Sequence, residues 1–163
     1  MIVRRETPDE ARAIGQFVTT AFLTARHADG NEAAIVARLR AEGGLLLSLV
    51  AEGAKGLIGH VAASPVTIGG AGGWGCIAPL AVCEAARRQG IGAALMRAAL
   101  ARLEAAGAGG VVVLGDPAYY GRFGLIADPA RFAPGLPPEY LLGRSFRDPP
   151  PAGEVRFHPA FGV

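Results

Sequence analysis

The sequence has few cysteines, few charged residues and no long apolar run, and each shortage removes a class of protein. Its two cysteines, Cys76 and Cys83, stand seven positions apart on or near one predicted strand, too far along an extended chain for a disulfide. No Cys-x-x-Cys pattern or His/Cys cluster indicates a metal site. The longest apolar stretch, residues 45–51, is far shorter than a membrane span. We therefore expect reduced cysteines, no metal and no association with a membrane.

The charge pattern also argues against a nucleic-acid partner. Charged residues make up 18% of the chain, and the net charge is only +2. The basic residues are almost all arginines, scattered over predicted helices without a clustered patch. Residues 1–6 turn polar at once and offer no apolar segment of a secretory signal. Together with reduced cysteines, this predicts a cytoplasmic protein.

The chain is long and apolar enough to fold as one domain. Its 163 residues are 51% hydrophobic, with a mean hydropathy of +0.33. We expect a single domain over residues 1–163, with a core of about 1–147 and a C-terminal extension over 148–163. Because prolines surround them, residues 140–146 and 155–158 are expected as edge strands.

Hydrophobic periods and turn residues predict a mixed α/β fold. Thr7-Pro8-Asp9-Glu10 is typical of a helix start, and Asn31 and Asp116 stand where they can cap helices. A loop that carries His27 precedes Asn31, and Gly69–Gly73 predicts a turn. The expected elements, in order, are strand 1–5, a helix from Pro8, helix 31–42, strands 45–51, 57–64 and 74–82, helix 90–106, strand 111–114 and a short helix from Pro117. Residues 74–114 thus form a strand–helix–strand unit with parallel strands.

The most informative segment lies between the strand that ends at Val82 and the helix that opens on Gly90 and Gly92. The first backbone N–H groups of a helix have no partner within it and lie at its positive end, so the segment favours an anion such as phosphate. The two glycines let a ligand approach the backbone closely.

Two known phosphate motifs fit poorly. A P-loop requires Gly-Lys-Ser/Thr, which this sequence lacks. A dinucleotide motif would begin with Gly90-Ile91-Gly92 and use Asp116 for the ribose, but Leu95 stands where a small residue is required.

A third motif covers more of the chain. Arg87-Arg88-Gln89-Gly90-Ile91-Gly92 resembles the (Arg/Gln)-x-x-Gly-x-(Gly/Ala) signature of the GNAT superfamily of acyl-CoA-dependent N-acyltransferases. Residues 116–125 are similar to a second family motif, in which an aromatic-Tyr pair precedes Gly-hydrophobe, and residues 155–161 resemble a bacterial branch of predicted acetyltransferases. The resemblance implies a largely antiparallel mixed sheet with a central parallel βαβ unit and helices on both faces.

The resemblance also implies acetyl-CoA as co-substrate and assigns roles to residues. Residues 88–93 would hold the pyrophosphate through backbone N–H groups, with charge from Arg87 and Arg88. A backbone N–H near Val82 would polarise the thioester carbonyl, and Tyr120 would protonate the departing thiolate. Alternatively, both tyrosines only pack their helix against the sheet. The expected cofactor-binding residues are Leu80, Ala81, Val82, Arg87, Arg88, Gln89, Gly90, Ile91, Gly92, Ala93 and Tyr119.

The group that deprotonates the acceptor amine is not identified by the sequence. Residues 74–79 lack the glutamate that many relatives carry there. The remaining candidates for the base are His60, water, or an acid such as Asp29 or Glu32 in the loop that relatives use to recognise the acceptor. The resemblance implies direct acetyl transfer to a primary amine of a small molecule or peptide. A non-catalytic acyl-CoA-binding sensor is the alternative. The apolar, proline-rich C-terminal third offers a surface for a homodimer.

Overall fold

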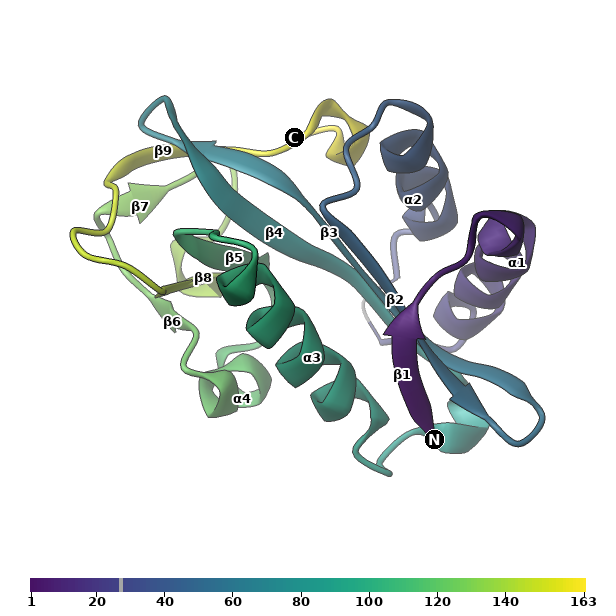
Figure 1. The fold of residues 1–163 in the computed structure, drawn as a ribbon. Helices are drawn as coiled ribbons and strands as arrows, with labels where there is room; N and C mark the ends of the chain where they lie inside the picture. Colours follow the sequence, from purple (N-terminus) through teal and green to yellow (C-terminus); the bar gives the residue numbers. More distant parts are fainter. Residues whose placement is uncertain (27) are drawn as a thin grey trace.

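The computed structural model describes residues 1–26 and 28–163, so His27 of the expected loop lies outside the described residues. One twisted sheet runs through the molecule (Figure 1). Its strands are β1 (Ile2–Arg5), β2 (Leu47–Gly53), β3 (Gly56–Ile68), β4 (Ala71–Val82), β5 (Gly110–Leu114), β6 (Ile126–Ala127), β7 (Arg131–Phe132), β8 (Leu141–Ser145) and β9 (Gly153–Arg156). Their order is β1-β2-β3-β4-β5-β8-β6, and β9 pairs with β3 and β7. Along the main path only β4 and β5 run parallel, as predicted.

Helices cover both faces of the sheet. They are α1 (Ala11–Phe22), α2 (Glu32–Ala41), α3 (Ile91–Ala105) and the short α4 (Pro117–Tyr120). Adjacent residues of a strand point to opposite faces, so Leu49 packs in the core beneath α3, whereas Val50 packs with α1 and α2. Figure 1 shows α3 running along one side of the long strands, away from α1 and α2. The predicted two-sided α/β architecture is confirmed.

Two sequence expectations about strands were wrong in detail. The turn expected over residues 69–73 consists of Gly69 and Gly70 alone, with φ of +58° and +82°, and β4 begins directly at Ala71. Two consecutive positive φ values are typical of a tight two-residue hairpin turn. The strands expected at sheet edges each have neighbours on two sides, β5 and β6 for β8, and β3 and β7 for β9.

The feature that positions the site is the separation of β4 from β5. In the described chain, β4 pairs with β5 only from Trp74 to Cys76, yet β4 continues to Val82. Within the β3–β4 ladder, Val61 pairs with Leu80 and Ala63 with Ile77, so β4 carries one extra residue, a bulge. Beyond this bulge, β4 presents an open backbone edge toward the space between the two parallel strands.

Candidate active site

Two adjoining cavities lie along the open edge of β4. The first, of about 330 Å³, lies between the end of β4 and the start of α3; we call it the basic cavity after its arginines Arg87, Arg88 and Arg122. The second, of about 440 Å³, lies between the bulge of β4 and the end of β5; we call it the acidic cavity after Asp29, Glu32 and Asp116. They share the side chains of Phe22, Leu80 and Tyr119. The two cavities therefore form one elongated cleft.

The basic cavity has the geometry of an anion site at a helix start. Gly90 caps α3 with a φ of +80°, and the first hydrogen bond of the helix runs from the Ala94 N–H to the Gly90 carbonyl at 3.0 Å. The N–H groups of residues 91–93 therefore lack partners within α3. Arg88 also adopts a left-handed conformation, with a φ of +64°, which costs a non-glycine residue about 1 kcal/mol. A turn that contains left-handed residues, such as Arg88 and Gly90 here, can direct several backbone N–H groups toward one concave side.

Arg87 plays a part that the sequence did not indicate. Its guanidinium donates to the Ala21 carbonyl at 2.6 Å, to Thr24 Oγ1 at 2.9 Å and to the Val82 carbonyl at 3.2 Å. These bonds tie the end of α1 to the end of β4. Arg87 lines the basic cavity, but most of its donors are engaged within the protein, whereas Arg88 is exposed.

The backbone of β4 offers its open-edge groups at alternate residues. The Cys83 N–H donates to the Ile58 carbonyl on β3 at 3.0 Å, so that pair is hydrogen-bonded. In an antiparallel ladder hydrogen-bonded and non-hydrogen-bonded pairs alternate, and the N–H and C=O groups of Val82 and Leu80 therefore point away from β3. The backbone groups of Ala81 point toward β3. Leu80 and Val82 are thus the residues of this segment whose backbone faces the cleft.

Tyr119 lines both cavities, whereas Tyr120 lines the acidic cavity alone. A methyl group added at Gly92 would come within 2.8 Å of the Tyr119 hydroxyl oxygen, so this hydroxyl lies against the start of α3. Arg122 stacks on the Tyr119 ring, with its guanidinium carbon 4.6 Å from the ring centroid. The Tyr120 ring instead covers Gly115 and lines the acidic cavity. The two rings meet edge to face at 5.0 Å.

Burial controls the protonation of Tyr120. Burial, followed by the neighbouring Tyr119 and Cys76, raises the pKa of the Tyr120 phenol to about 12. The hydroxyl group therefore keeps its proton at neutral and moderately alkaline pH. Tyr120 is therefore present as a proton donor in the cleft, and burial makes it a weaker acid than an exposed phenol.

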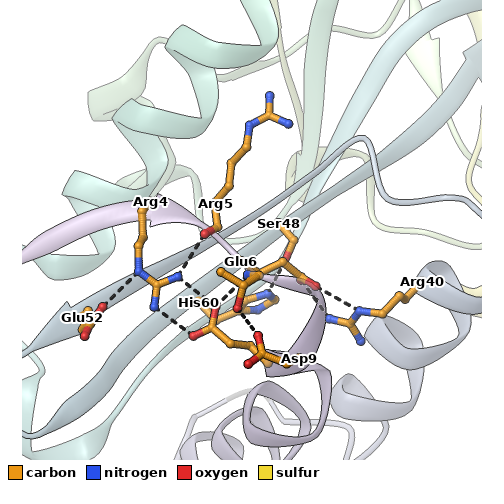
Figure 2. A network of polar contacts seen from close by, with 10 residues as sticks. Arg4, Arg5, Glu6, Asp9, Arg40, Ser48, Glu52 and His60 are labelled. Carbon is orange, nitrogen blue, oxygen red and sulfur yellow. Dashed lines mark hydrogen bonds and ion pairs between the residues drawn. The ribbon is translucent and has the colours of Figure 1, made fainter.

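His60 lies away from both cavities. It is fully buried on β3, and its Nε2 atom lies 2.9 Å from Ser48 Oγ, within a network that includes Glu6 and Arg40 (Figure 2). Burial lowers the pKa of His60 to about 4. Of the named side chains proposed as the base, Asp29 and Glu32 line the cleft and His60 does not.

The turn at Asp29 and Gly30 before α2 is held by Glu32 rather than by the cap expected at Asn31. The Glu32 carboxylate accepts hydrogen bonds from the backbone N–H groups of Asp29 at 2.8 Å and Gly30 at 3.1 Å. Asn31 occupies the N-cap position, but its side chain makes no capping bond among the described residues. A carboxylate in the first turn also interacts favourably with the positive helix end.

The predicted site residues gather well, and further residues join them. All of the expected cofactor-binding residues except Gln89 line the basic cavity, and Tyr120 lines the acidic one. The sequence did not point to Arg122, Phe157 or Phe161. Arg122 stands three positions after Tyr119 on a helical turn, which is a usable signal. Phe157 and Phe161 lie within residues 155–161, which resemble a bacterial branch of predicted acetyltransferases, but that resemblance assigned them no role in the site.

Other kinds of site find no support in the described part of the chain. Residues 1–26 and 28–163 contain no group of three or more His, Cys, Asp or Glu side chains that could hold a metal ion. No helix within these ranges has the length and apolarity needed to cross a membrane.

Comparison with known proteins identifies relatives of the sequence. The model of the acetyltransferase (GNAT) family matches residues 13–124. The uncharacterized N-acetyltransferase YhbS of Escherichia coli strain K12 is 42% identical over 126 residues, which cover 76% of this chain and 72% of that protein.

Solved structures give the same assignment. A GNAT family acetyltransferase from Brucella melitensis, crystallised with acetyl-CoA, has a TM-score of 0.86 and 41% identity over 98% of this chain and 97% of its own. YhbS from Escherichia coli, crystallised with CoA, has a TM-score of 0.88 and 34% identity, covering 99% of this chain and 92% of its own. The family match spans more than half of the chain and includes the start of α3 and both tyrosines. The chain therefore belongs to the GNAT family of acetyltransferases.

Proposed function

We propose that the protein transfers an acetyl group from acetyl-CoA directly to a primary amine, with both substrates bound together in the cleft. The observation that carries this proposal is the continuity of the basic cavity with the acidic cavity, which places an anion-binding helix start and a protonated tyrosine along one open strand edge. A ternary complex needs such a continuous cleft, because the amine must reach the thioester without a covalent intermediate on the protein.

The residues of the basic cavity fit coenzyme A. Arg88 and the N–H groups of residues 88–93 supply positive charge and donors for its pyrophosphate. The outward backbone groups of Leu80 can pair with an amide of a pantetheine arm as a neighbouring strand would, whereas the Val82 carbonyl already accepts from Arg87. Because Gly92 has no side chain, coenzyme A can approach the start of α3 beside the Tyr119 hydroxyl. When bound, acetyl-CoA supplies an activated acetyl thioester at this edge.

Groups of the protein then stabilise the developing charge and transfer the protons. The Val82 N–H, directed into the cleft, stabilises negative charge that develops on the carbonyl oxygen. The amine nitrogen forms a bond to the acetyl carbon as the carbon–sulfur bond breaks, and Tyr120 donates its phenolic proton to the departing sulfur. The amine's own proton leaves to water in the acidic cavity, and solvent restores the proton of Tyr120. His60 lies elsewhere and the Glu32 carboxylate already accepts two backbone bonds, whereas Asp29 lines the acidic cavity and can relay the proton to this water.

Calorimetry with acetyl-CoA and an assay of thiol release over a panel of primary amines test the proposal together. We expect acetyl-CoA to bind and at least one amine to be acetylated, with the product identified by mass spectrometry. Binding without turnover for every amine would instead support an acyl-CoA sensor. Absence of acetyl-CoA binding would contradict both functions.

A further inference from the structure

Charged side chains of opposite sign line the two halves of the cleft. The basic cavity is lined by Arg87, Arg88 and Arg122, and no described Asp or Glu lines it. The acidic cavity is lined by Asp29, Glu32 and Asp116, and no Lys, Arg or His of residues 1–26 and 28–163 lines it. This separation matters for the acceptor, because the charged side chains that line the acidic cavity, among those the structure describes, are all carboxylates.

The rest of the acidic cavity is mainly apolar, and its far wall comes from the C-terminal segment. Phe157 and Phe161 lie with their ring centroids 6.3 Å apart and both line the cavity. The segment is fastened to α2, since Arg38 Nη1 donates to the Pro159 carbonyl at 3.2 Å. His158 Nε2 lies 3.8 Å from a Glu42 carboxylate oxygen. The wall lies outside residues 13–124, which match the family model.

We propose that the acceptor is a small amine with an apolar or aromatic body and without a carboxylate or phosphate group. This inference rests on the proposed acetyl transfer and specifies its acceptor. An ammonium group is attracted by Asp29, Glu32 and Asp116 during approach, whereas an acidic group on the acceptor would face these like charges, and no cationic side chain of the described residues lines the cavity to pair with it. The phenyl rings of Phe157 and Phe161 provide apolar contact for the body of the amine.

A matched set of three acceptors tests charge separately from size. The set consists of 2-phenylethylamine, phenylalanine and phenylalaninamide, which replaces the carboxylate by a neutral amide of nearly the same size. We expect kcat/KM to be about tenfold or more higher for 2-phenylethylamine and for phenylalaninamide than for phenylalanine. Equal or better use of phenylalanine, or exclusion of the amide along with phenylalanine, would overturn the inference while leaving acetyl transfer intact. Acetylation of none of the three nor of any other amine would overturn the proposed function and the inference with it.

The chain offers a matched pair of acidic residues for the charge effect. Asp116 and Asp128 each accept a hydrogen bond from the backbone N–H two residues later, at 2.9 Å in both cases. Only Asp116 lines the acidic cavity. Asp116→Asn is expected to reduce the preference for 2-phenylethylamine over phenylalanine about threefold, because one repelling charge is lost while the asparagine still caps the turn. Asp128→Asn is expected to leave the preference unchanged, and an equal change in both variants would contradict the assignment.

A second pair tests the apolar wall. Phe161→Ala is expected to raise KM for 2-phenylethylamine about fivefold, because apolar contact is lost, while KM for methylamine changes little. The control is Phe132→Ala, which removes a phenyl ring that is 49% exposed and lines neither cavity. A similar rise for methylamine would mean that the segment supports the fold rather than selecting the acceptor, and would overturn this part of the inference.

Discussion

At the scale of single residues, the two adjacent tyrosines contact different elements around the cleft. Successive residues of a helix point about 100° apart, so Tyr119 reaches the start of α3 while Tyr120 covers Gly115 at the end of β5. The sequence indicated that one tyrosine serves the cofactor and the other the chemistry. Both tyrosines line the cleft, and their roles stay predictions.

Replacing Tyr120 by phenylalanine tests its role as a proton donor. Tyr120→Phe keeps the ring and its packing but removes the hydroxyl, so we expect kcat to fall about 100-fold with little change in the Kd for acetyl-CoA. Steady-state kinetics and calorimetry measure the two quantities. An unchanged kcat would remove Tyr120 from the mechanism and leave it as a packing residue.

Gly92 and Gly15 provide a matched pair of helical glycines. In Gly92→Ala the new methyl group would lie 2.8 Å from the Tyr119 hydroxyl, so we expect weaker acetyl-CoA binding as Tyr119 is displaced into the basic cavity. In Gly15→Ala the methyl group meets nothing within 4 Å, so the free energy of unfolding should rise by about 1 kcal/mol with unchanged binding. Calorimetry and urea denaturation separate the two effects. Equal acetyl-CoA affinity in both variants would show that Gly92 is not needed for ligand approach.

At the scale of elements, the connection from β4 to α3 has both a structural and a binding part. Arg87 joins the end of α1 to β4, and Arg88 takes a strained backbone conformation at the mouth of the basic cavity. The sequence grouped the two arginines as phosphate ligands, since both are cations beside a helix start. The packing of α1 against the end of β4 distinguishes them, because it brings Arg87 to the Ala21 carbonyl and leaves Arg88 exposed.

Single substitutions should separate these two parts. Arg87→Ala is expected to lower the free energy of unfolding by about 2 kcal/mol, because the Ala21 and Val82 carbonyls lose a charged donor. Arg88→Gly is expected to change stability by less than about 0.5 kcal/mol, since relief of backbone strain offsets the extra freedom of glycine in the unfolded chain. Chemical denaturation measures both.

The same variants differ in ligand binding. Arg88→Gly should weaken acetyl-CoA binding about fivefold at low salt and less at high salt, because it removes an exposed cation from the phosphate region. A loss of affinity that does not depend on salt would argue against a direct contact between Arg88 and phosphate.

At the scale of the whole molecule, a polar network joins β1, β2, β3 and α2 on the face of the sheet opposite α3. Arg4 bonds to Glu10 and Glu52, Arg40 bonds to Glu6, and Ser48 bonds to the buried His60 (Figure 2). His60 also pairs through β3 with Ala81 on β4, so the network borders the strand that forms the cleft. A buried imidazole in this position makes stability depend on pH.

The direction of this dependence follows from the pKa of His60. Its pKa is lowered from 6.5 to about 4 by burial, so the unfolded chain binds a proton at higher pH than the folded protein. Stability is therefore full above pH 6.5 and falls as the pH drops from 6.5 toward 4. Between pH 7 and pH 5 we expect the free energy of unfolding to decrease by about 2 kcal/mol.

The variant His60→Gln checks the assignment, because glutamine can still bond to Ser48 but does not titrate. Urea denaturation at pH 7 and pH 5 should show a much smaller decrease than in the original protein. The control His158→Gln leaves His60 in place and should retain the decrease. The lowered pKa values of Glu6 and Glu10 add a further loss of stability in the same direction, but below about pH 4.5. An unchanged pH dependence in His60→Gln would assign the effect to other groups.

The sequence by itself determined what depends on near neighbours along the chain. Thr7 and Glu10 mark a helix start, and the Thr7 N–H does donate to the Glu10 carboxylate at 2.7 Å. Asp116 caps the turn that carries the tyrosines, and Gly90 opens α3 in the conformation that glycine favours. The helix start, the parallel strands and the tyrosine pair were sufficient to indicate the family and the donor.

Only the tertiary structure decided what depends on segments far apart in the sequence. The bulge and open edge of β4 arise from its pairing with β3 and its separation from β5. The position of β8 within the sheet and the aromatic wall from Phe157 and Phe161 result from long-range pairing that local periodicity does not encode. Acceptor selection belongs to this second class, because side chains from α1, α2, β4, β5 and the C-terminal segment must meet around one cavity. Most of the basic cavity is formed by residues close together in the sequence, between Leu80 and Ala93, whereas the acidic cavity is assembled from segments far apart in the sequence.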